Sequence, residues 1–134
     1  MMIRSFFLCL LISLFGVSCV TNPPKYLYKV LTLEDWSGSK KQRNIVLHSF
    51  DKPFVHLAEE GQVDRIVKKY FEGKQAVVIL NLNSQRLPGH LVFESNPGGA
   101  SKYWHLYDGS LPFEAVESHE LWTPTGESKP PPSQ

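Results

Sequence analysis

The chain has 134 residues, which is enough for one small domain and too few for several. Lysine and arginine total 14 and aspartate and glutamate total 13, so the formal net charge of +1 gives no electrostatic case for nucleic acid as a partner. Hydrophobic residues make up 42% of the chain, which suffices for one modest core but excludes several membrane spans.

The first 18 residues have the order of a bacterial secretory signal. Arg4 supplies a positive charge, residues 6–17 are mostly apolar, and small residues precede Cys19. A cysteine in this place resembles a bacterial lipobox, in which the thiol receives a lipid and becomes the new N-terminus. We therefore expect a lipoprotein anchored in the membrane of the bacterial cell envelope through Cys19. Ordinary cleavage with secretion and an uncleaved anchor are the alternatives.

The rest of the chain divides into three parts. Residues 19–25 contain two prolines and predict a short, stiff tether. Residues 26–122 carry the apolar periodicity of a folded domain, and residues 123–134 are rich in proline and predict a disordered tail. No cysteine follows Cys19, so the domain can form neither an internal disulfide nor a zinc site with cysteine ligands.

The first half of the domain predicts strands and helices in alternation. Residues 26–31 favour a strand, and Thr32 is spaced from Asp35 as a helix cap, which predicts a short helix through Trp36. A polar loop over 37–44 and short strands over 45–48 and 54–57 follow. Residues 59–71 place apolar side chains at helical spacing and predict the longest helix.

The second half predicts strands only. Residues 76–82 form an apolar run, interrupted only by Asn81, that suits a central strand buried on both faces. Residues 90–94 alternate as a strand, residues 96–100 form a glycine-rich loop, residues 103–107 are rich in aromatic side chains, and residues 113–121 end the domain as a strand. Together the elements predict an α+β fold with one long helix.

Three residues have surroundings in which they could carry chemistry. His56 and His105 lie among apolar neighbours, where an imidazole can act as acid, base or ligand. Glu94 ends an apolar strand directly before the glycine-rich loop. The alternatives are histidines hydrogen-bonded in the core and a solvated carboxylate. The three could also form a metal site, but their separations match no compact metal motif, so we assign no metal.

Several short motifs recur in a fixed order along residues 26–121. They are Tyr28–Leu31 with Trp36, Phe54–Leu57 with Gln62 and the Tyr70-Phe71 helix end, and Phe93-Glu94, Gly98-Gly99 and His105–Tyr107 with Leu111 and Val116. In this order they resemble a small bacterial family known as domain of unknown function 952. That family is similar in fold to the ADP-ribosyltransferases and the RNA 2′-phosphotransferases. The resemblance implies two small, mainly antiparallel sheets packed together, with a cleft that holds NAD in those enzymes.

The resemblance also implies functional residues. The family's recurrent polar positions fall on His56 and His105, which would orient a ligand or move protons, and on Glu94, which would stabilise positive charge at an anomeric carbon. The ligand-binding candidates in the same cleft are Tyr28, Lys29 and Tyr107. The first strand offers only Lys29 where the enzymes usually have histidine or arginine.

We therefore expect an uncharacterised envelope lipoprotein whose domain binds a small ligand or a protein partner. An active transferase or hydrolase that uses NAD or ADP-ribose is the alternative, and a metal-dependent hydrolase is a third.

Overall fold

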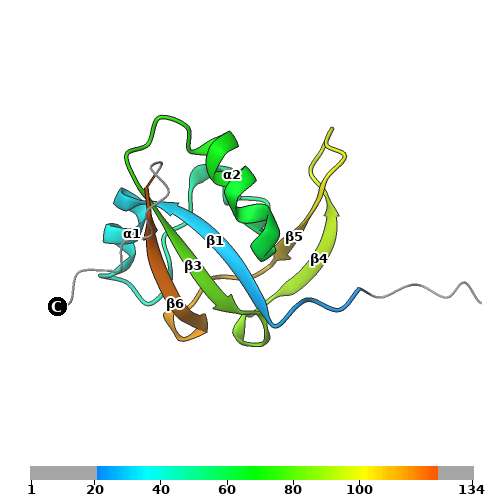
Figure 1. Cartoon of the computed structure of the whole chain (residues 1–134). Coiled ribbons are helices and arrows are strands. Elements are labelled where there is room, and N and C mark those ends of the chain that lie inside the picture. Colours follow the sequence, from blue (N-terminus) through cyan, green and yellow to red (C-terminus); the bar gives the residue numbers. More distant parts are fainter. Residues whose placement is uncertain (1–20, 124–134) are drawn as a thin grey trace, which may run out of the picture.

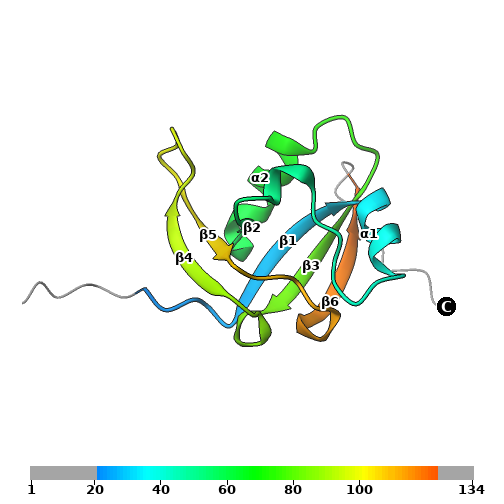
Figure 2. The ribbon, with the colours of Figure 1, turned by 180° about the vertical axis from the view of Figure 1, so that it is seen from behind.

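Two three-stranded antiparallel sheets share a core in the computed structural model, which describes residues 21–123 (Figures 1 and 2). The first sheet has the order β1 (Tyr26–Thr32), β3 (Val77–Asn83), β6 (Val116–Trp122). The second has the order β2 (Val55–Leu57), β5 (Lys102–Tyr107), β4 (His90–Ser95). The two α-helices are α1 (Leu33–Ser39) and α2 (Val63–Tyr70). The α+β class with two antiparallel sheets is therefore confirmed.

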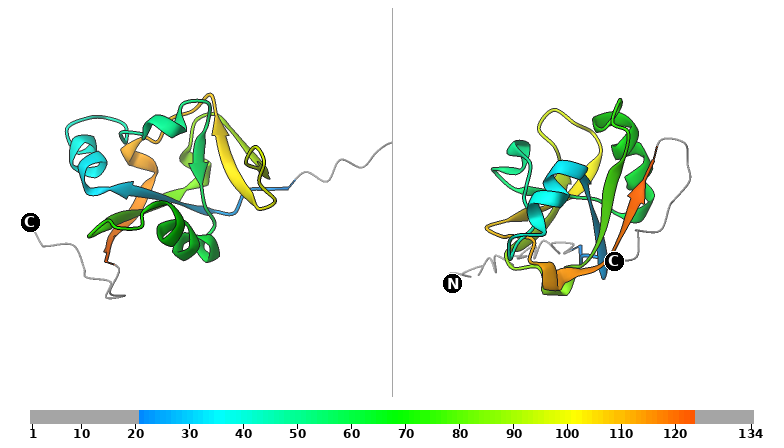
Figure 3. Two further views of the ribbon diagram at one scale, coloured as in Figure 1. Left: turned by 90° about the horizontal axis from the view of Figure 1, so that it is seen from above. Right: turned by 90° about the vertical axis from the view of Figure 1, so that its left-hand side faces the viewer.

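The strand alternation divides the apolar side chains between two clusters. Leu80 of β3 and Trp104 of β5 belong to the cluster between the sheets. Ile79, on the other face of β3, packs with Val67 of α2 in the second cluster. Because β3 is covered on both faces, its sequence is apolar except for Asn81 and Asn83, and the prediction of a central buried strand is confirmed. Figure 3 shows α2 along the flank of β1 and α1 at the end of that strand.

The beginning of α2 is fastened to the second sheet. Glu59 and Gln62 form a capping box, in which each side chain accepts a hydrogen bond from the backbone N–H of the other. Trp104 Nε1 donates to Glu59 Oε1 at 3.0 Å, and Gln62 Nε2 donates to the Lys102 carbonyl at 2.9 Å. These contacts fix the position of α2 relative to β5.

Two expected helix boundaries are wrong. The α-helix expected over 59–71 covers only Val63–Tyr70, because the turn Glu60–Gln62 inside the capping box is a 3-10 helix. The helix α1 continues past Trp36 to Ser39, whose hydroxyl donates to the Asp35 carbonyl at 2.6 Å, so the loop expected over 37–44 begins later.

Two expected strand assignments are also wrong. Residues 45–48 form no strand, because the chain pairs there only through an isolated bridge between Asn44 and Pro112, and proline has no N–H with which to extend a ladder. The strand expected over 113–121 starts at Val116, since Phe113–Ala115 is a 3-10 turn closed by a hydrogen bond from Ala115 N to the Pro112 carbonyl at 3.0 Å.

The described chain begins in contact with the domain. Ser84 Oγ donates to the Pro24 carbonyl at 2.6 Å, and Ser84 N donates to the Lys25 carbonyl at 2.9 Å, so the end of the expected tether is held in place. The expected leader, Cys19 and nearly all of the expected tail lie outside the described residues. None of the helices within residues 21–123 has the length and apolar character needed to cross a membrane.

Candidate functional site

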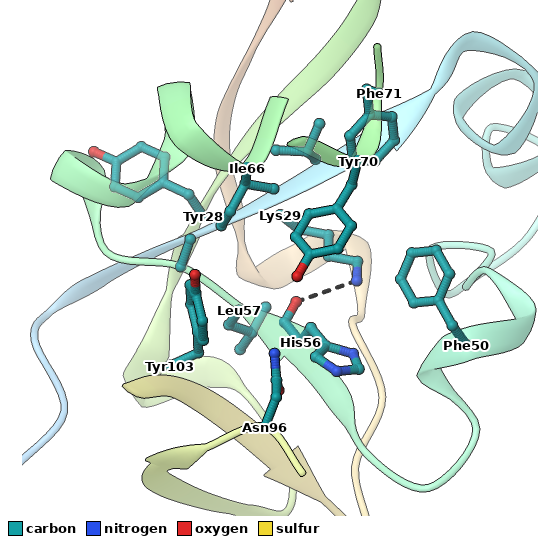
Figure 4. A pocket seen from close by; sticks show the side chains of 12 residues that line it. Tyr28, Lys29, Phe50, His56, Leu57, Ile66, Tyr70, Phe71, Asn96 and Tyr103 are labelled. Carbon is teal, nitrogen blue, oxygen red and sulfur yellow. Dashed lines mark hydrogen bonds between the residues drawn. The ribbon is translucent and has the colours of Figure 1, made fainter. Parts of the chain in front are cut away.

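A pocket of about 310 Å³ opens between α2, β1 and the second sheet (Figure 4). Ile66 and Tyr70 of α2 lie on one side of it, and His56 of β2 and Tyr103 of β5 lie on the other. The remaining lining residues are Tyr28, Lys29, Val30, Phe50, Leu57, Ala58, Phe71 and Asn96. A largely aromatic and aliphatic wall with a few converging polar groups suits a ligand with a planar apolar body.

Asp51 is the buried centre of a group of polar contacts with Lys29 and His56, two residues that line the pocket. Its Oδ1 and Oδ2 accept hydrogen bonds from Lys29 Nζ at 2.8 and 2.7 Å, and the third contact of Nζ is the His56 carbonyl at 3.1 Å. Oδ1 also accepts from His56 N at 3.0 Å and lies 3.0 Å from His56 Nδ1. All three Lys29 donors are therefore engaged within the protein, and they hold the segment that carries His56.

The charge state of this group follows from its surroundings. Burial raises the pKa of Asp51, but the hydrogen bonds from His56 and the positive charge of Lys29 outweigh that effect and lower it below its ordinary value of 3.8. Burial lowers the pKa of Lys29 against the attraction of Asp51. The ionised Asp51 accepts the Nδ1 proton of His56, so a neutral His56 ring presents Nε2 as an acceptor.

A second polar group lies beside the first on the same sheet. His105 Nδ1 lies 3.0 Å from Glu94 Oε1, and the Tyr107 hydroxyl donates to the same oxygen at 2.5 Å. His105 is fully buried and stacks on Phe54, with their ring centroids 4.0 Å apart. The two hydrogen bonds lower the pKa of Glu94, and the bond to Glu94 raises the pKa of Tyr107.

Burial also shifts the pKa of His105. It lowers the pKa of the imidazole more than the hydrogen bond to Glu94 raises it. His105 Nε2 lies 2.9 Å from Asn96 Oδ1. Asn96 thus connects this group to the pocket that it lines.

The structure places the six predicted site residues in two adjoining groups. Those that line the pocket are Tyr28, Lys29 and His56. Those in the neighbouring hydrogen-bonded group, off the pocket lining, are Glu94, His105 and Tyr107. The two groups meet because the pairing of β2 with β5 sets His56 directly opposite His105. The centroids of these two imidazole rings are 5.3 Å apart.

The three catalytic candidates do not converge on one point. His56 Nδ1 is directed at Asp51, and both ring nitrogens of His105 already have partners. Among residues 21–123, no three histidine, cysteine, aspartate or glutamate side chains are placed to hold a metal ion. The arrangement instead offers one imidazole nitrogen and the hydroxyl groups of Tyr70 and Tyr103 to a ligand in the pocket (Figure 4).

Sequence reasoning missed several residues of the site, above all Asp51, Asn96 and Tyr103. One signal for Asp51 was present in the sequence. Lys29 falls between Leu27 and Leu31 on the core-facing side of β1, and a buried ammonium requires a buried carboxylate. The sequence does not say which acidic residue supplies it.

Comparisons with known proteins agree with this fold. The crystal structure of protein CC0527 from Caulobacter crescentus is 25% identical, with a TM-score of 0.63 over 78% of this chain and 93% of that chain. The solution NMR structure of CC0527 is 26% identical, with a TM-score of 0.61 over 72% and 83%. No curated protein matches the chain significantly. The model of the family described as protein of unknown function (DUF952) matches residues 30–119. The chain therefore belongs to the DUF952 family.

Proposed function

We propose that the chain is a cell-envelope lipoprotein whose folded domain binds a small ligand with a planar aromatic group. The pocket between α2 and the second sheet carries this proposal. Its walls include Phe50 and Ile66, and the polar groups of His56, Tyr70 and Tyr103 lie around them (Figure 4). Apolar walls bind the body of a ligand, and a few fixed polar groups set its orientation.

The second candidate is a transferase or hydrolase that acts on NAD or ADP-ribose. The contact between Asp51 and His56 favours it, because an aspartate on Nδ1 leaves Nε2 free to act as a base at the pocket. The position of Glu94 argues against this candidate. Its carboxylate lies off the pocket lining and accepts hydrogen bonds from His105 and Tyr107. Ligand binding without turnover is therefore the function that the geometry supports best.

Thermal unfolding of the purified protein with millimolar NAD or ADP-ribose tests the binding proposal. A probe at about 100 times its dissociation constant stabilises the fold by about 2.7 kcal/mol, which raises the melting temperature of a domain of this size by several degrees. His56→Ala should reduce the shift, because it removes a polar group of the pocket wall. His90→Ala, at the exposed start of β4, is the matched control and should leave the shift unchanged.

The same samples separate the two candidates. Release of nicotinamide from NAD would favour the transferase or hydrolase, while a shift without turnover would favour binding. A melting temperature that neither probe moves would contradict both candidates for these ligands.

The lipid anchor is tested by membrane fractionation. The unaltered protein should sediment with membranes, and Cys19→Ala should move it to the soluble or secreted fraction, because the variant has no thiol to receive a lipid. Cys9→Ala, inside the expected leader, is the control and should leave the protein with the membranes. Retention of Cys19→Ala in the membrane fraction would count against lipidation at this residue.

A further inference from the structure

A second cavity of about 290 Å³ adjoins the aromatic pocket. The two cavities share Tyr70, Asn96 and Tyr103, so a single ligand can occupy both. One wall of the second cavity is formed by side chains of α2, and the other by the glycine-rich loop over residues 96–100 together with Ser101. Its lining differs from that of the aromatic pocket, because it contains two cationic side chains, Arg65 and Lys69, and no acidic side chain.

Arg65 is held in position by neutral groups. Its Nη1 donates to Ser101 Oγ at 3.2 Å, and its Nη2 donates to the Tyr103 hydroxyl at 2.8 Å. The guanidinium lies over the Tyr103 ring, 5.5 Å from its centroid. A guanidinium has about five N–H donors, so most of them remain available to a ligand. The side chain is therefore oriented before any ligand binds, and no carboxylate neutralises its positive charge.

Lys69 lies one helical turn further along α2. Its Nζ is 5.0 Å from the centroid of the Tyr70 ring, the other aromatic ring that the two cavities share. Within the described part of the chain, no carboxylate forms an ion pair with Arg65 or Lys69. The four ion pairs among the described residues all involve other side chains. Two uncompensated cations thus flank the passage from the aromatic pocket to the glycine-rich loop.

We propose that this second cavity is a phosphate subsite, and that the ligand is a phosphorylated aromatic compound of the nucleotide class. The aromatic ring would occupy the pocket beside His56 and Tyr103, and the phosphate would bind Arg65 and Lys69. Arginine matches the geometry of phosphate oxygens, and lysine adds a second positive charge. This inference rests on the proposed function, since it requires that the aromatic pocket holds the ring.

Calorimetric titration with two matched pairs of probes tests the subsite in the full-length protein. The pairs are adenosine with adenosine monophosphate, and nicotinamide riboside with nicotinamide mononucleotide. For at least one pair, the phosphorylated probe should bind about tenfold more tightly or better. The advantage should shrink as the salt concentration rises, because ions screen the exposed cations.

Substitutions locate the effect. Arg65→Gln and Lys69→Gln should each reduce the phosphate advantage, and together they should bring the affinity ratio of the pair close to one. Lys68→Gln removes the same charge from the exposed adjacent position of α2, outside the cavity, and should leave the ratio unchanged. Arg65→Lys, which keeps the charge, should retain part of the advantage even if the contact with Tyr103 is lost.

The outcomes distinguish the subsite from the pocket. Equal affinity within both pairs would overturn the phosphate subsite while the aromatic pocket stands. A phosphate advantage that survives the double substitution would overturn it as well, since the phosphate would then bind elsewhere. Failure of all four probes to bind would overturn both the subsite and the aromatic pocket.

Discussion

Replacing Asp51 by asparagine is expected to lower the free energy of unfolding by about 3–5 kcal/mol. Asparagine is close to aspartate in size, so the change removes the negative charge and leaves the shape. The Lys29 ammonium then stays buried, with 4% of its side chain exposed, and has lost its one ion-pair partner among the described residues. The loss is dominated by this uncompensated charge rather than by the hydrogen bonds. Urea unfolding monitored by tryptophan fluorescence measures it.

The double variant Lys29→Met with Asp51→Asn separates the two contributions. It removes both charges, so it should be markedly more stable than Asp51→Asn alone, because methionine needs no partner in the core. The control is Glu117→Gln, in the exposed pair with Arg86, whose nitrogen lies 3.4 Å from the carboxylate. An exposed pair contributes about 0–1 kcal/mol. If Asp51→Asn lowered the free energy of unfolding no more than Glu117→Gln does, the proposed stabilisation by the buried Lys29–Asp51 pair would be contradicted.

The same residue predicts how stability depends on pH. The pKa of Asp51 is lower in the folded protein than its ordinary value of 3.8, so the ionised carboxylate stabilises the fold. This contribution is complete above about pH 4 and is lost as the pH falls through the lower, folded value. Unfolding free energies measured between about pH 7 and pH 2 should therefore decline more steeply for the unaltered protein than for Asp51→Asn.

The elements that depend on local periodicity could be predicted from the sequence. The apolar run over 76–82 and the stripe of α2 gave the central strand and the helix that covers it. The segment 45–48 has the composition of a strand, but pairing there stops at Pro112, which is remote in sequence. Local composition contains no information about that partner, so the expected strand was wrong.

The site could be predicted only in part, for a similar reason. The apolar neighbours of His56 and of His105 indicate each residue separately, and the pairing of β2 with β5 sets the two side by side. That register depends on contacts between distant segments. Asp51 lies in what reads locally as a polar turn before Pro53, and only the fold brings it under Lys29. The residues of the pocket come from β1, β2, α2 and β5, so no single stretch of sequence contains the pocket.

Gly89→Ala is expected to lower the free energy of unfolding by at least about 3 kcal/mol. Gly89 precedes β4 and has a φ of +109°, a conformation that strains any residue with a Cβ. A Cβ at this position would lie 2.4 Å from the Tyr107 carbonyl oxygen and 2.9 Å from the Gly109 Cα. Both neighbours are backbone atoms, so no side-chain rotation can relieve the contact. The start of β4 must move away from the end of β5.

Gly61→Ala is the matched control for this substitution. Its added Cβ would meet no atom within 4 Å, so urea unfolding should show a change of less than about 1 kcal/mol. The displacement caused by Gly89→Ala should also reach the site, because His90 pairs with Tyr107, and Tyr107 donates to Glu94. Nuclear magnetic resonance should then show shifted His105 ring signals in any Gly89→Ala protein that still folds. Equal stability of the two variants, with unchanged His105 signals, would contradict the close backbone contact at this end of the second sheet.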